Sequence, residues 1–386
     1  MIRIVADQNI VAVDSFFKDI GELVKVPGRT ISNTDLRDAD VLLVRSITRV
    51  DRALLTGTAV RFVGTATSGT DHVDLDYLVQ EGIEFADAKG TNANAVVEYC
   101  LTAFAYLRSY YDGPTMGCQV GVIGAGAVGS RLLRKLRALG FETLAFDPLL
   151  TPVDRQDLES IGVRFGDLAA VLASSVVSLH VPLTTQGPHP TFHMLADKEL
   201  DQLIPNAILI NTSRGEVIDS VALKRLLASR PDVLSVIDVW DGEPKVEASL
   251  VEKVDLATPH IAGYSFEAKL AATLRLARAL SEHYELEEGG GLRGELAPNR
   301  ESISGKPIKC STDLDSLLLE VFPLRQISDE FKRNVDHAVE ENLFDLARAR
   351  QVDRHEFSHY QIAVQDVSPP LRDEIETIGF VVTAPD

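Results

Sequence analysis

The chain has 386 residues, of which 45% are hydrophobic and 25% are charged. At about 150 residues per domain, this length predicts two or three domains whose cores need no disulfide or metal support. The ordinary composition excludes wholesale disorder and collagen-like repeats. Acidic residues number 57 against 38 basic ones, which gives a net charge of −19. Such an acidic chain is repelled by nucleic-acid phosphates and anionic lipids, so we expect neither nucleic acid nor a membrane as its main partner.

The cysteines indicate a reducing environment. Cys100, Cys118 and Cys310 are odd in number and widely spaced, so they form neither a disulfide framework nor a C-x-x-C metal clamp. The N-terminal residues lack the basic and apolar pattern of a signal peptide, and no stretch approaches the ~18 apolar residues of a membrane helix. We therefore expect a cytoplasmic protein without a metal site.

In chain order, short β-rich runs alternate with helix-length segments, a pattern typical of a parallel sheet with crossover helices. The first such series predicts helical segments around residues 11–20 and 71–81. A long apolar segment, 94–111, then predicts a buried connecting helix that ends before Gly113-Pro114. The predicted strands of this series are residues 2–6, 41–45, 61–66 and 84–87.

A second α/β series follows Cys118, and its strands are almost entirely apolar, as expected when helices cover both faces of a sheet. After its last strand, residues 265–286 predict an amphipathic helix that could pack back against the first series and make that domain discontinuous in sequence. The predicted strands are residues 119–123, 143–147, 176–181, 207–211 and 234–239.

The remainder of the chain predicts a small C-terminal domain. Residues 287–305 are polar and rich in glycine, which indicates a linker. Helical stretches are predicted near 312–322 and 328–350, and a strand–helix–strand pattern closes the chain. This segment is too short and too poor in polar clusters for a second enzyme, so we expect an oligomerisation or regulatory domain.

A dinucleotide-binding motif begins the second series. Gly124, Gly126 and Gly129 follow a predicted strand and open a predicted helix. The first glycine allows a tight turn, the second lets the backbone approach a pyrophosphate, and the third allows close helix–strand packing. Asp147 ends the next strand, where a carboxylate binds the adenosine ribose and repels a 2′-phosphate. The motif therefore predicts NAD rather than NADP.

Other cofactor contacts are expected where later strands end, because dinucleotides lie across the carboxyl edge of such a sheet. For His180, a cofactor contact and a hydrogen-bonded core histidine are equally compatible with the sequence. The candidate positions are His180 to Pro182, Asn211 to Ser213, and Asp238.

Three polar residues after strands of this series suit the oxidation of a 2-hydroxy acid: Arg214, Glu243 and His260. Histidine titrates near neutral pH and can take the hydroxyl proton while hydride leaves the same carbon. A glutamate on its other ring nitrogen would fix the tautomer, and an arginine would hold the substrate carboxylate as a planar fork. Taken singly, each residue could equally be a surface ion pair or a cap. A Ser-His-Asp hydrolase is disfavoured because the chain lacks a G-x-S-x-G elbow.

With the glycine motif, SRGEVID, DVWDGEP and TPHIAG, the chain resembles the NAD-dependent D-2-hydroxyacid dehydrogenases. The segments VRSITRV, FVGTATSGTDHVD, NANAVVEY, HIAGYSFEAK and FDLARARQVDRHEFSHYQIAV resemble members that oxidise 4-phospho-D-erythronate to 2-oxo-3-hydroxy-4-phosphobutanoate in vitamin B6 biosynthesis. The resemblance implies two Rossmann-like doubly wound parallel-sheet domains and a small α+β C-terminal dimerisation domain. The implied boundaries are 1–93 with 265–286 for the substrate-binding domain, 94–264 for the NAD-binding domain and 287–386 for the homodimerisation domain.

The resemblance also implies residue roles. Arg214, Glu243 and His260 would be catalytic, with His260 as the proton donor and acceptor. The implied substrate contacts are Ser46, Thr67 and Tyr264, and the implied NAD contacts are Asp147, Val181, Asp238 and Gly263.

The substrate phosphate would need an anion pocket, for which strand ends of the first series offer cations, hydroxyls and backbone N–H groups. Arg45 and Arg49 could instead pair with surface carboxylates. The candidate residues are Arg45, Ser46, Arg49, Thr65, Thr67, Ser68 and Gly69. Two other functions stay open. One is the oxidation of 3-phosphoglycerate or another D-2-hydroxy acid, and the other is a non-catalytic protein that senses NAD through its partners.

Overall fold

The computed structural model describes residues 1–111, 113–286, 300–303, 307–335, 343–351 and 353–384. The chain divides into two compact units. The first unit comprises Met1–Asn92 and Ser265–Pro298, and the second comprises Ala93–Tyr264 and Asn299–Asp386. Two parallel sheets and a small third sheet confirm the predicted α/β class.

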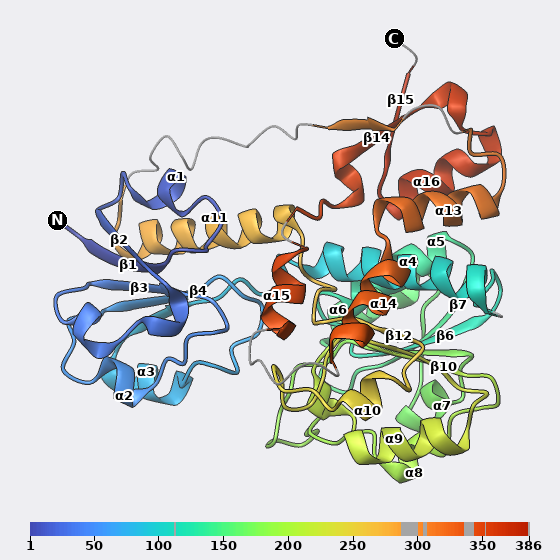
Figure 1. Cartoon of the computed structure of the whole chain (residues 1–386), viewed down its shortest axis with the longest axis horizontal. Helices are drawn as coiled ribbons and strands as arrows, with labels where there is room; N and C mark the ends of the chain where they lie inside the picture. Colours follow the sequence, from blue (N-terminus) through green and yellow to red (C-terminus); the bar gives the residue numbers. More distant parts are fainter. Residues whose placement is uncertain (112, 287–299, 304–306, 336–342, 352, 385–386) are drawn as a thin grey trace. The chain divides into compact units, whose positions relative to one another are not determined.

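The first unit contains a five-stranded parallel sheet with strand order β2-β1-β3-β4-β5 (Figure 1). In this order the chain changes direction between β1 and β3, so the carboxyl ends of those two strands border the crevice where ligands bind in open α/β sheets. The strands are β1 (Arg3–Asp7), β2 (Glu22–Val26), β3 (Val41–Val44), β4 (Phe62–Thr65) and β5 (Glu84–Ala86).

Four α-helices of the described first unit accompany this sheet. The longest, α11, follows Ser265, whose hydroxyl caps the helix by accepting a hydrogen bond from the N–H of Ala268. Leu276 and Leu280 of α11 share a buried cluster with Ile4 and Phe62 of the sheet. The helices are α1 (Val13–Phe17), α2 (Arg52–Leu55), α3 (Leu75–Glu81) and α11 (Phe266–His283), and two 3-10 turns span Gly28–Thr30 and Asn33–Leu36.

The second unit is built on a seven-stranded parallel sheet with strand order β12-β11-β10-β9-β6-β7-β8. This is the doubly wound order of dinucleotide-binding domains, and its direction changes between β6 and β9. All residues of β9 and β10 are buried, which explains their apolar sequences. The strands are β6 (Gln119–Ile123), β7 (Glu142–Phe146), β8 (Arg164–Phe165), β9 (Val176–Leu179), β10 (Ile208–Asn211), β11 (Leu234–Ile237) and β12 (Leu256–Ala257).

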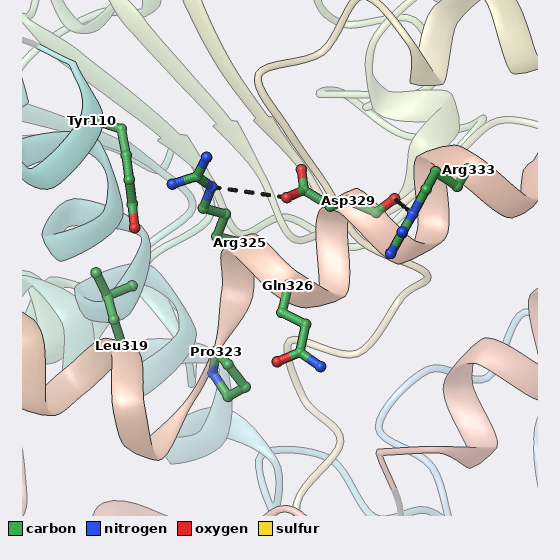
Figure 2. Close-up of a pocket in the computed structure, with 7 residues that line it drawn as sticks. All are labelled: Tyr110, Leu319, Pro323, Arg325, Gln326, Asp329 and Arg333. Carbon is green, nitrogen blue, oxygen red and sulfur yellow. Dashed lines mark hydrogen bonds and ion pairs between the residues drawn. The ribbon is translucent and has the colours of Figure 1, made fainter.

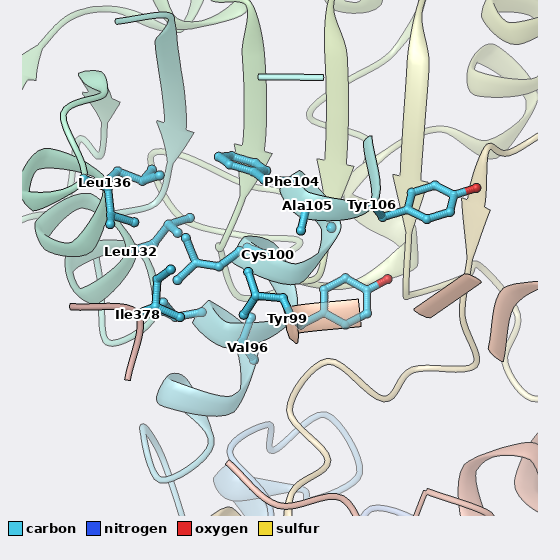
Figure 3. Packing of buried hydrophobic residues seen from close by; sticks show 14 of the residues in the cluster. Val96, Tyr99, Cys100, Phe104, Ala105, Tyr106, Leu132, Leu136 and Ile378 are labelled. Atoms are coloured by element: carbon cyan, nitrogen blue, oxygen red, sulfur yellow. The ribbon is translucent and has the colours of Figure 1, made fainter. Parts of the chain in front are cut away.

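Helix α4 (Ala93–Tyr110) lies in the core of the second unit, as its apolar sequence predicts. Figure 3 shows Tyr99, Cys100 and Phe104 of this helix packed with Leu132 and with Ile378 near the C-terminus. The other helices before residue 264 are α5 (Gly129–Ala138), α6 (Pro152–Ser160), α7 (Leu168–Leu172), α8 (Asp197–Leu200), α9 (Ser220–Ser229) and α10 (Ala248–Val251).

The C-terminal segment shares its core with the second unit. Leu318, Phe322 and Phe357 belong to the same buried cluster as Tyr99 and Phe104 of α4. The predicted strand–helix–strand pattern is confirmed by β14, α16 and β15. The elements are β13 (Glu301–Ile303), α13 (Ser311–Val321), α14 (Leu324–Val335), α15 (Leu343–Ala349), β14 (Tyr360–Ala363), α16 (Arg372–Ile378) and β15 (Val381–Thr383).

The structure differs from the expected elements at several places. β2 is an edge strand without a fully buried residue, and β8 and β12 have two residues each, so none carries the long apolar run of an interior strand. Part of the expected linker, Glu301–Ile303, pairs with β14, while 287–299 and 304–306 lie outside the described residues. The expected helix over 328–350 corresponds to α14 and α15, and 336–342 also lie outside the description.

None of the described helices combines the length and the apolar character required to cross a bilayer.

Candidate active site

The turn between β6 and α5 contains three glycines in different surroundings. A Cβ atom at Gly124, where φ is +89°, would lie 2.6 Å from the carbonyl oxygen of His180 and 2.8 Å from Cγ1 of Val181. A Cβ atom at Gly129 would overlap the carbonyl oxygen of Gly124. At Gly126, a Cβ atom would meet nothing within 4 Å. Two glycines therefore allow close packing, and the third borders open space near the N-terminus of α5, which suits a pyrophosphate.

Asp147, directly after β7, lies against this turn. Its Oδ2 atom accepts a hydrogen bond of 2.8 Å from the N–H of Ala125, and its Oδ1 atom accepts one of 3.0 Å from the N–H of Leu149. Each carboxylate oxygen can accept a second hydrogen bond. Asp147 can therefore fix the turn and still bind a ribose hydroxyl.

His180, at the end of β9, is a hydrogen-bonded histidine of the sheet edge. Its Nε2 atom lies 2.8 Å from Oγ of Ser178, and its Nδ1 atom lies 3.3 Å from Oγ1 of Thr212. Burial lowers the pKa of His180 to about 3, so the ring is neutral at ordinary pH. Burial also raises the pKa of the neighbouring Cys100 thiol to about 12, although Thr212 and Ser178 hydrogen-bond to it. These contacts favour a hydrogen-bonded core histidine over a cofactor contact for His180.

Glu243 and His260, 17 residues apart in the sequence, form a hydrogen-bonded pair. Oε2 of Glu243 lies 2.8 Å from Nδ1 of His260. The other oxygen, Oε1, accepts a 2.8 Å hydrogen bond from the backbone N–H of Trp240. The indole N–H of Trp240 in turn donates to the carbonyl oxygen of Thr258 at 2.9 Å. The carboxylate is thus oriented by the backbone on one side and orients the imidazole on the other.

The electrostatics of this pair define the tautomer of the histidine. Burial by itself raises the pKa of Glu243, but the charge of His260 and the hydrogen bonds from His260 and Trp240 lower this pKa below its ordinary value. The carboxylate is therefore ionised at neutral pH and accepts the hydrogen bond, so Nδ1 of His260 carries the proton. Within the described residues, Nε2 has no hydrogen-bond partner, and the side chain is 32% exposed. Nε2 is thus available to a substrate proton.

Asp238, after β11, anchors the loop that carries His260. Its carboxylate is fully buried and accepts hydrogen bonds from the hydroxyl of Thr258 (2.6 Å) and the N–H groups of Ile261 (2.7 Å) and Ala262 (2.9 Å). Burial raises the pKa of Asp238, while the His260 charge and the three donors act in the opposite direction. His260 adopts a left-handed φ of +55°, which this set of contacts holds in place.

Arg214 follows β10 on a loop held by its neighbours. The side-chain amide of Asn211 donates to the carbonyl oxygen of Arg214 at 2.9 Å, and the Arg214 guanidinium donates to the carbonyl oxygen of Ser213 at 2.8 Å. A Cβ atom at Gly215 would overlap the backbone of Trp240 and Asp241. The loops that carry Arg214 and Glu243 are therefore in direct backbone contact, which only glycine permits.

In the first unit, the two candidate phosphate-binding arginines have carboxylate partners. Arg45 Nε and Nη2 donate to the two oxygens of Asp7 at 2.8 and 3.3 Å, and the Asp7 side chain is fully buried. Arg49 donates to Asp51 at 2.9 Å, but its side chain is 83% exposed. The alternative of ion pairing is thus observed for both residues, and for Arg45 the partner is a core carboxylate rather than a surface one.

Ser46 and Thr67 lie close to the carboxyl ends of β3 and β4. Ser46 is exposed. The hydroxyl of Thr67 donates to the carbonyl oxygen of Gly69 at 2.9 Å and lies 2.8 Å from the hydroxyl of Thr65. Both predicted residues therefore sit at the strand ends of the first sheet.

Gly263 and Tyr264 close the loop after His260 in the second unit, and both are half-buried. The N–H of Tyr264 donates to the carbonyl oxygen of Ile261 at 2.8 Å. The guanidinium carbon of Arg348, in α15, lies 5.6 Å from the centre of the Tyr264 ring. The C-terminal segment thus contributes a cation beside this predicted substrate residue.

A separate surface pocket of about 300 Å³ lies among α4, α13 and α14 (Figure 2). It contains none of the residues predicted to bind NAD or substrate. Its lining residues are Tyr110, Leu319, Pro323, Arg325, Gln326, Asp329 and Arg333.

The chain is similar both to a known domain family and to known full-length proteins. Residues 106–262 match the model of the D-isomer specific 2-hydroxyacid dehydrogenase NAD binding domain. The erythronate-4-phosphate dehydrogenase of Pseudomonas putida strain F1 is 41% identical over 98% of this chain and 99% of its own length. The chain belongs to the D-isomer specific 2-hydroxyacid dehydrogenase family.

A second relative and a solved structure are also similar to this chain. The Stutzerimonas stutzeri protein of the same name is 42% identical over 98% of both chains. The NAD⁺-bound 3-phosphoglycerate dehydrogenase of Entamoeba histolytica superposes with a TM-score of 0.62 at 22% identity, covering 76% of this chain and 98% of that one. At this identity the structural likeness shows the fold alone.

As a member of this family, the chain is an NAD-dependent dehydrogenase, which confirms the predicted cofactor. The residues present fit the cofactor. Open space at Gly126, the N-terminus of α5 and the carboxylate of Asp147 are complementary to a pyrophosphate and a ribose without a 2′-phosphate.

Sequence reasoning did not identify the residues that support the pair of Glu243 and His260. Trp240 is the single tryptophan of the chain and stands three positions before Glu243, which was an available signal. Thr258 and Tyr99 had no such signal, because the 2.7 Å contact between their hydroxyls joins residues 159 positions apart.

Proposed function

We propose that the chain oxidises 4-phospho-D-erythronate to 2-oxo-3-hydroxy-4-phosphobutanoate with NAD, a step of pyridoxal phosphate biosynthesis. The substrate is suggested by relatives with about 40% identity over nearly the whole chain, which are named erythronate-4-phosphate dehydrogenase. The chemistry rests on one observation, the 2.8 Å hydrogen bond between Nδ1 of His260 and the ionised Glu243.

In the proposed reaction, the C2 hydroxyl of the substrate becomes a carbonyl. Nε2 of His260 takes the hydroxyl proton, and the C2 hydrogen leaves as hydride. Bound NAD supplies the hydride acceptor. Glu243 keeps Nδ1 protonated and stabilises the imidazolium that forms when Nε2 takes the proton. In the reverse direction the imidazolium returns this proton, so the same pair serves both directions.

Arg214 is proposed to bind the carboxylate of the substrate next to C2. A guanidinium offers two parallel N–H groups to a carboxylate, which fixes both the position and the rotation of that group. The contact between Gly215 and Trp240 supports this role because it joins the Arg214 loop to the Glu243 loop. The proposed NAD contacts are Gly124, Gly126, Gly129, Asp147, Val181, Asp238 and Gly263.

The remaining substrate contacts are proposed at Ser46, Thr67 and Tyr264, and the first unit is proposed as the substrate-binding domain. Arg45 is a weaker candidate for the phosphate, since Asp7 neutralises its charge. Its Nη1 group is not used by that pair and could still donate to a phosphate oxygen.

The deciding experiment is a spectrophotometric assay of NADH formation by the purified protein. We expect kcat/KM for 4-phospho-D-erythronate to exceed that for 3-phosphoglycerate by at least about 100-fold. A preference for 3-phosphoglycerate would move the substrate assignment to another D-2-hydroxy acid. Absence of turnover with every 2-hydroxy acid, together with tight NAD binding, would instead favour an NAD-sensing protein.

We also propose a cytoplasmic homodimer formed through residues 287–386. The reducing compartment is supported by the three free cysteines, of which Cys310 is exposed. Among the described residues of this segment, Leu346 is the one large apolar side chain that is exposed, at 53%, and we propose it as a contact of the dimer interface. Light scattering on the full chain measures the mass of the assembly, and Leu346→Glu should shift it towards the monomer.

A further inference from the structure

The backbone of the loop after His260 is held from two sides by opposite charges. On one side, the carboxylate of Asp238 accepts the N–H groups of Ile261 and Ala262. On the other, Nη1 of Arg354 donates to the carbonyl oxygens of the same two residues, at 3.2 and 2.8 Å. Four backbone groups next to His260 are thus fixed by two side chains.

Arg354 lies in the C-terminal segment and is 92 residues away from Ala262 in the sequence. Its side chain is only 5% exposed. The guanidinium lies 3.9 Å from the ring centre of Phe322, and its Nη2 donates to the carbonyl oxygen of Ala95 in α4 at 2.8 Å. Stacking and three backbone acceptors leave the guanidinium plane little freedom to rotate.

We propose that Arg354 is a positioning residue for His260, acting through the carbonyl groups of Ile261 and Ala262. The inference rests on the proposed catalytic role of His260. It assigns the C-terminal segment a part in catalysis in addition to any role in assembly.

The role of Arg354 depends on the conformation of His260. A left-handed φ of +55° costs free energy for a residue other than glycine and persists only where the surroundings impose it. Without Arg354, the carbonyl oxygen of Ala262 would lose its side-chain donor, and that of Ile261 would keep only the N–H of Tyr264. The peptide group that follows Ala262 could then rotate, although Asp238 still holds the N–H groups of Ile261 and Ala262. The imidazole would then move relative to Glu243, and a displacement of about 1 Å can reduce a rate by about 100-fold.

The first test compares Arg354→Met with Arg350→Met in the full-length chain. Arg350 belongs to the same segment, but its side chain is 60% exposed and pairs with Glu330 at the surface. We expect Arg354→Met to lower kcat by about 10- to 100-fold, with KM and the Kd for NADH within about twofold of the parent. Arg350→Met should keep the parental kcat.

The second readout is the ring tautomer of His260, followed by ¹⁵N NMR of histidine-labelled protein without substrate. His260→Asn identifies its signal among the nine histidines. We expect the parent to show a protonated Nδ1 and Arg354→Met to show a mixture of tautomers. An unchanged His260 signal, or a parental kcat in the folded variant, would overturn the proposal, as would parallel losses of kcat, NADH affinity and Tm.

Arg354→Lys covers the case in which the methionine variant does not fold. Lysine keeps the buried charge but lacks the planar fork that reaches several carbonyl groups. We expect a smaller shift of the same two readouts, and fully parental values for this variant would also overturn the role of Arg354. The NMR comparison needs no turnover, so it decides this inference even if the parent fails to oxidise 4-phospho-D-erythronate, which would refute only the proposed substrate.

Discussion

The carboxyl edges of the two large sheets use buried charge in different ways. In the second unit, the carboxylate of Asp238 binds backbone N–H groups of the neighbouring loop, and a separate loop carboxylate, Glu243, orients His260. In the first unit, the buried carboxylate of Asp7 pairs with the guanidinium of Arg45. A strand-end charge neutralised by another side chain stabilises the fold. A charge satisfied by the main chain can shape a loop and leave a neighbouring side chain available for chemistry.

The largest expected effect is at the carboxyl edge of the second unit's sheet, where His260 lies. Replacing His260 with Asn removes the proposed base, and kcat should fall by about 1,000-fold while NAD binding is retained. His193→Asn is the matched control, because His193 also has a left-handed φ, of +49°, which Asn tolerates. Steady-state kinetics and NADH titration measure both variants. Equal activities would refute the role of His260.

The glycine turn gives the next largest effect and separates steric from ligand roles. Gly124→Ala should lower the free energy of unfolding by about 3 kcal/mol, because its Cβ atom meets the backbone of His180 at a positive φ. Gly126→Ala should change stability by less than about 0.5 kcal/mol. Its methyl group should nevertheless weaken NAD binding by about 10-fold, or ~1.4 kcal/mol. Chemical denaturation measures the stability of both variants, and NADH titration measures their cofactor affinity. Similar stability of the two variants would contradict a steric role for Gly124 and a ligand-binding role for Gly126.

Arg214→Lys tests whether the planar guanidinium of Arg214 binds the substrate carboxylate. We expect kcat/KM to fall by about 100-fold, because lysine keeps the charge but loses the paired N–H groups. Arg225→Lys is the control, since Arg225 pairs with Asp197 at the surface and its side chain is 59% exposed. Near-parental turnover of the Arg214 variant would show that Arg214 does not bind the substrate carboxylate in this way.

At the carboxyl edge of the first unit's sheet, we expect a substitution to lower stability. Arg45→Met leaves the buried Asp7 without its cation and should lower the free energy of unfolding by about 2 kcal/mol, less than for a fully buried pair because Arg45 is 25% exposed. Arg49→Met, at an 83% exposed side chain, should leave Tm unchanged. Thermal unfolding of both variants sharpens the comparison. If the Arg45 variant were stable but bound substrate more weakly, Arg45 would have a role in substrate binding instead.

The smallest expected effect concerns pH. Because the folded protein lowers the pKa of Glu243 below its ordinary value of 4.5, the ionised carboxylate stabilises the fold above that pH. This contribution is lost as the pH falls through the lowered pKa of the folded state. The difference in unfolding free energy between the parent and Glu243→Gln should therefore shrink below pH 4.5. A difference that stays constant would show that the pair does not stabilise the fold.

Much of the fold could be predicted because its signals are local. Apolar runs such as that of β6 predict interior strands, and the apolar surface of α4 predicts a buried helix. The glycine motif between β6 and α5 predicted the cofactor, since its three positions are close in the chain. The short edge strands β8 and β12 were not predicted, because two residues carry no periodic pattern.

The candidate site was predictable in its residue types but not in its supports. Glu243 and His260 suit a proton-transfer pair, and the structure brings them together. Arg45 was predicted as a phosphate contact, but its partner Asp7 is 38 residues away and gave no local signal. The contact between Arg354 and Ala262 spans 92 residues and was equally hidden.

The sequence by itself determined the α/β class, the strands that lie inside the sheets, the preference for NAD and the residues able to transfer a proton. These follow from hydrophobic periodicity, backbone sterics and side-chain chemistry, which act over a few residues. Only the tertiary structure decided which charges neutralise each other and which hold a loop. Those outcomes depend on buried groups that meet across long stretches of chain, where each polar atom must find whichever partner the packing supplies.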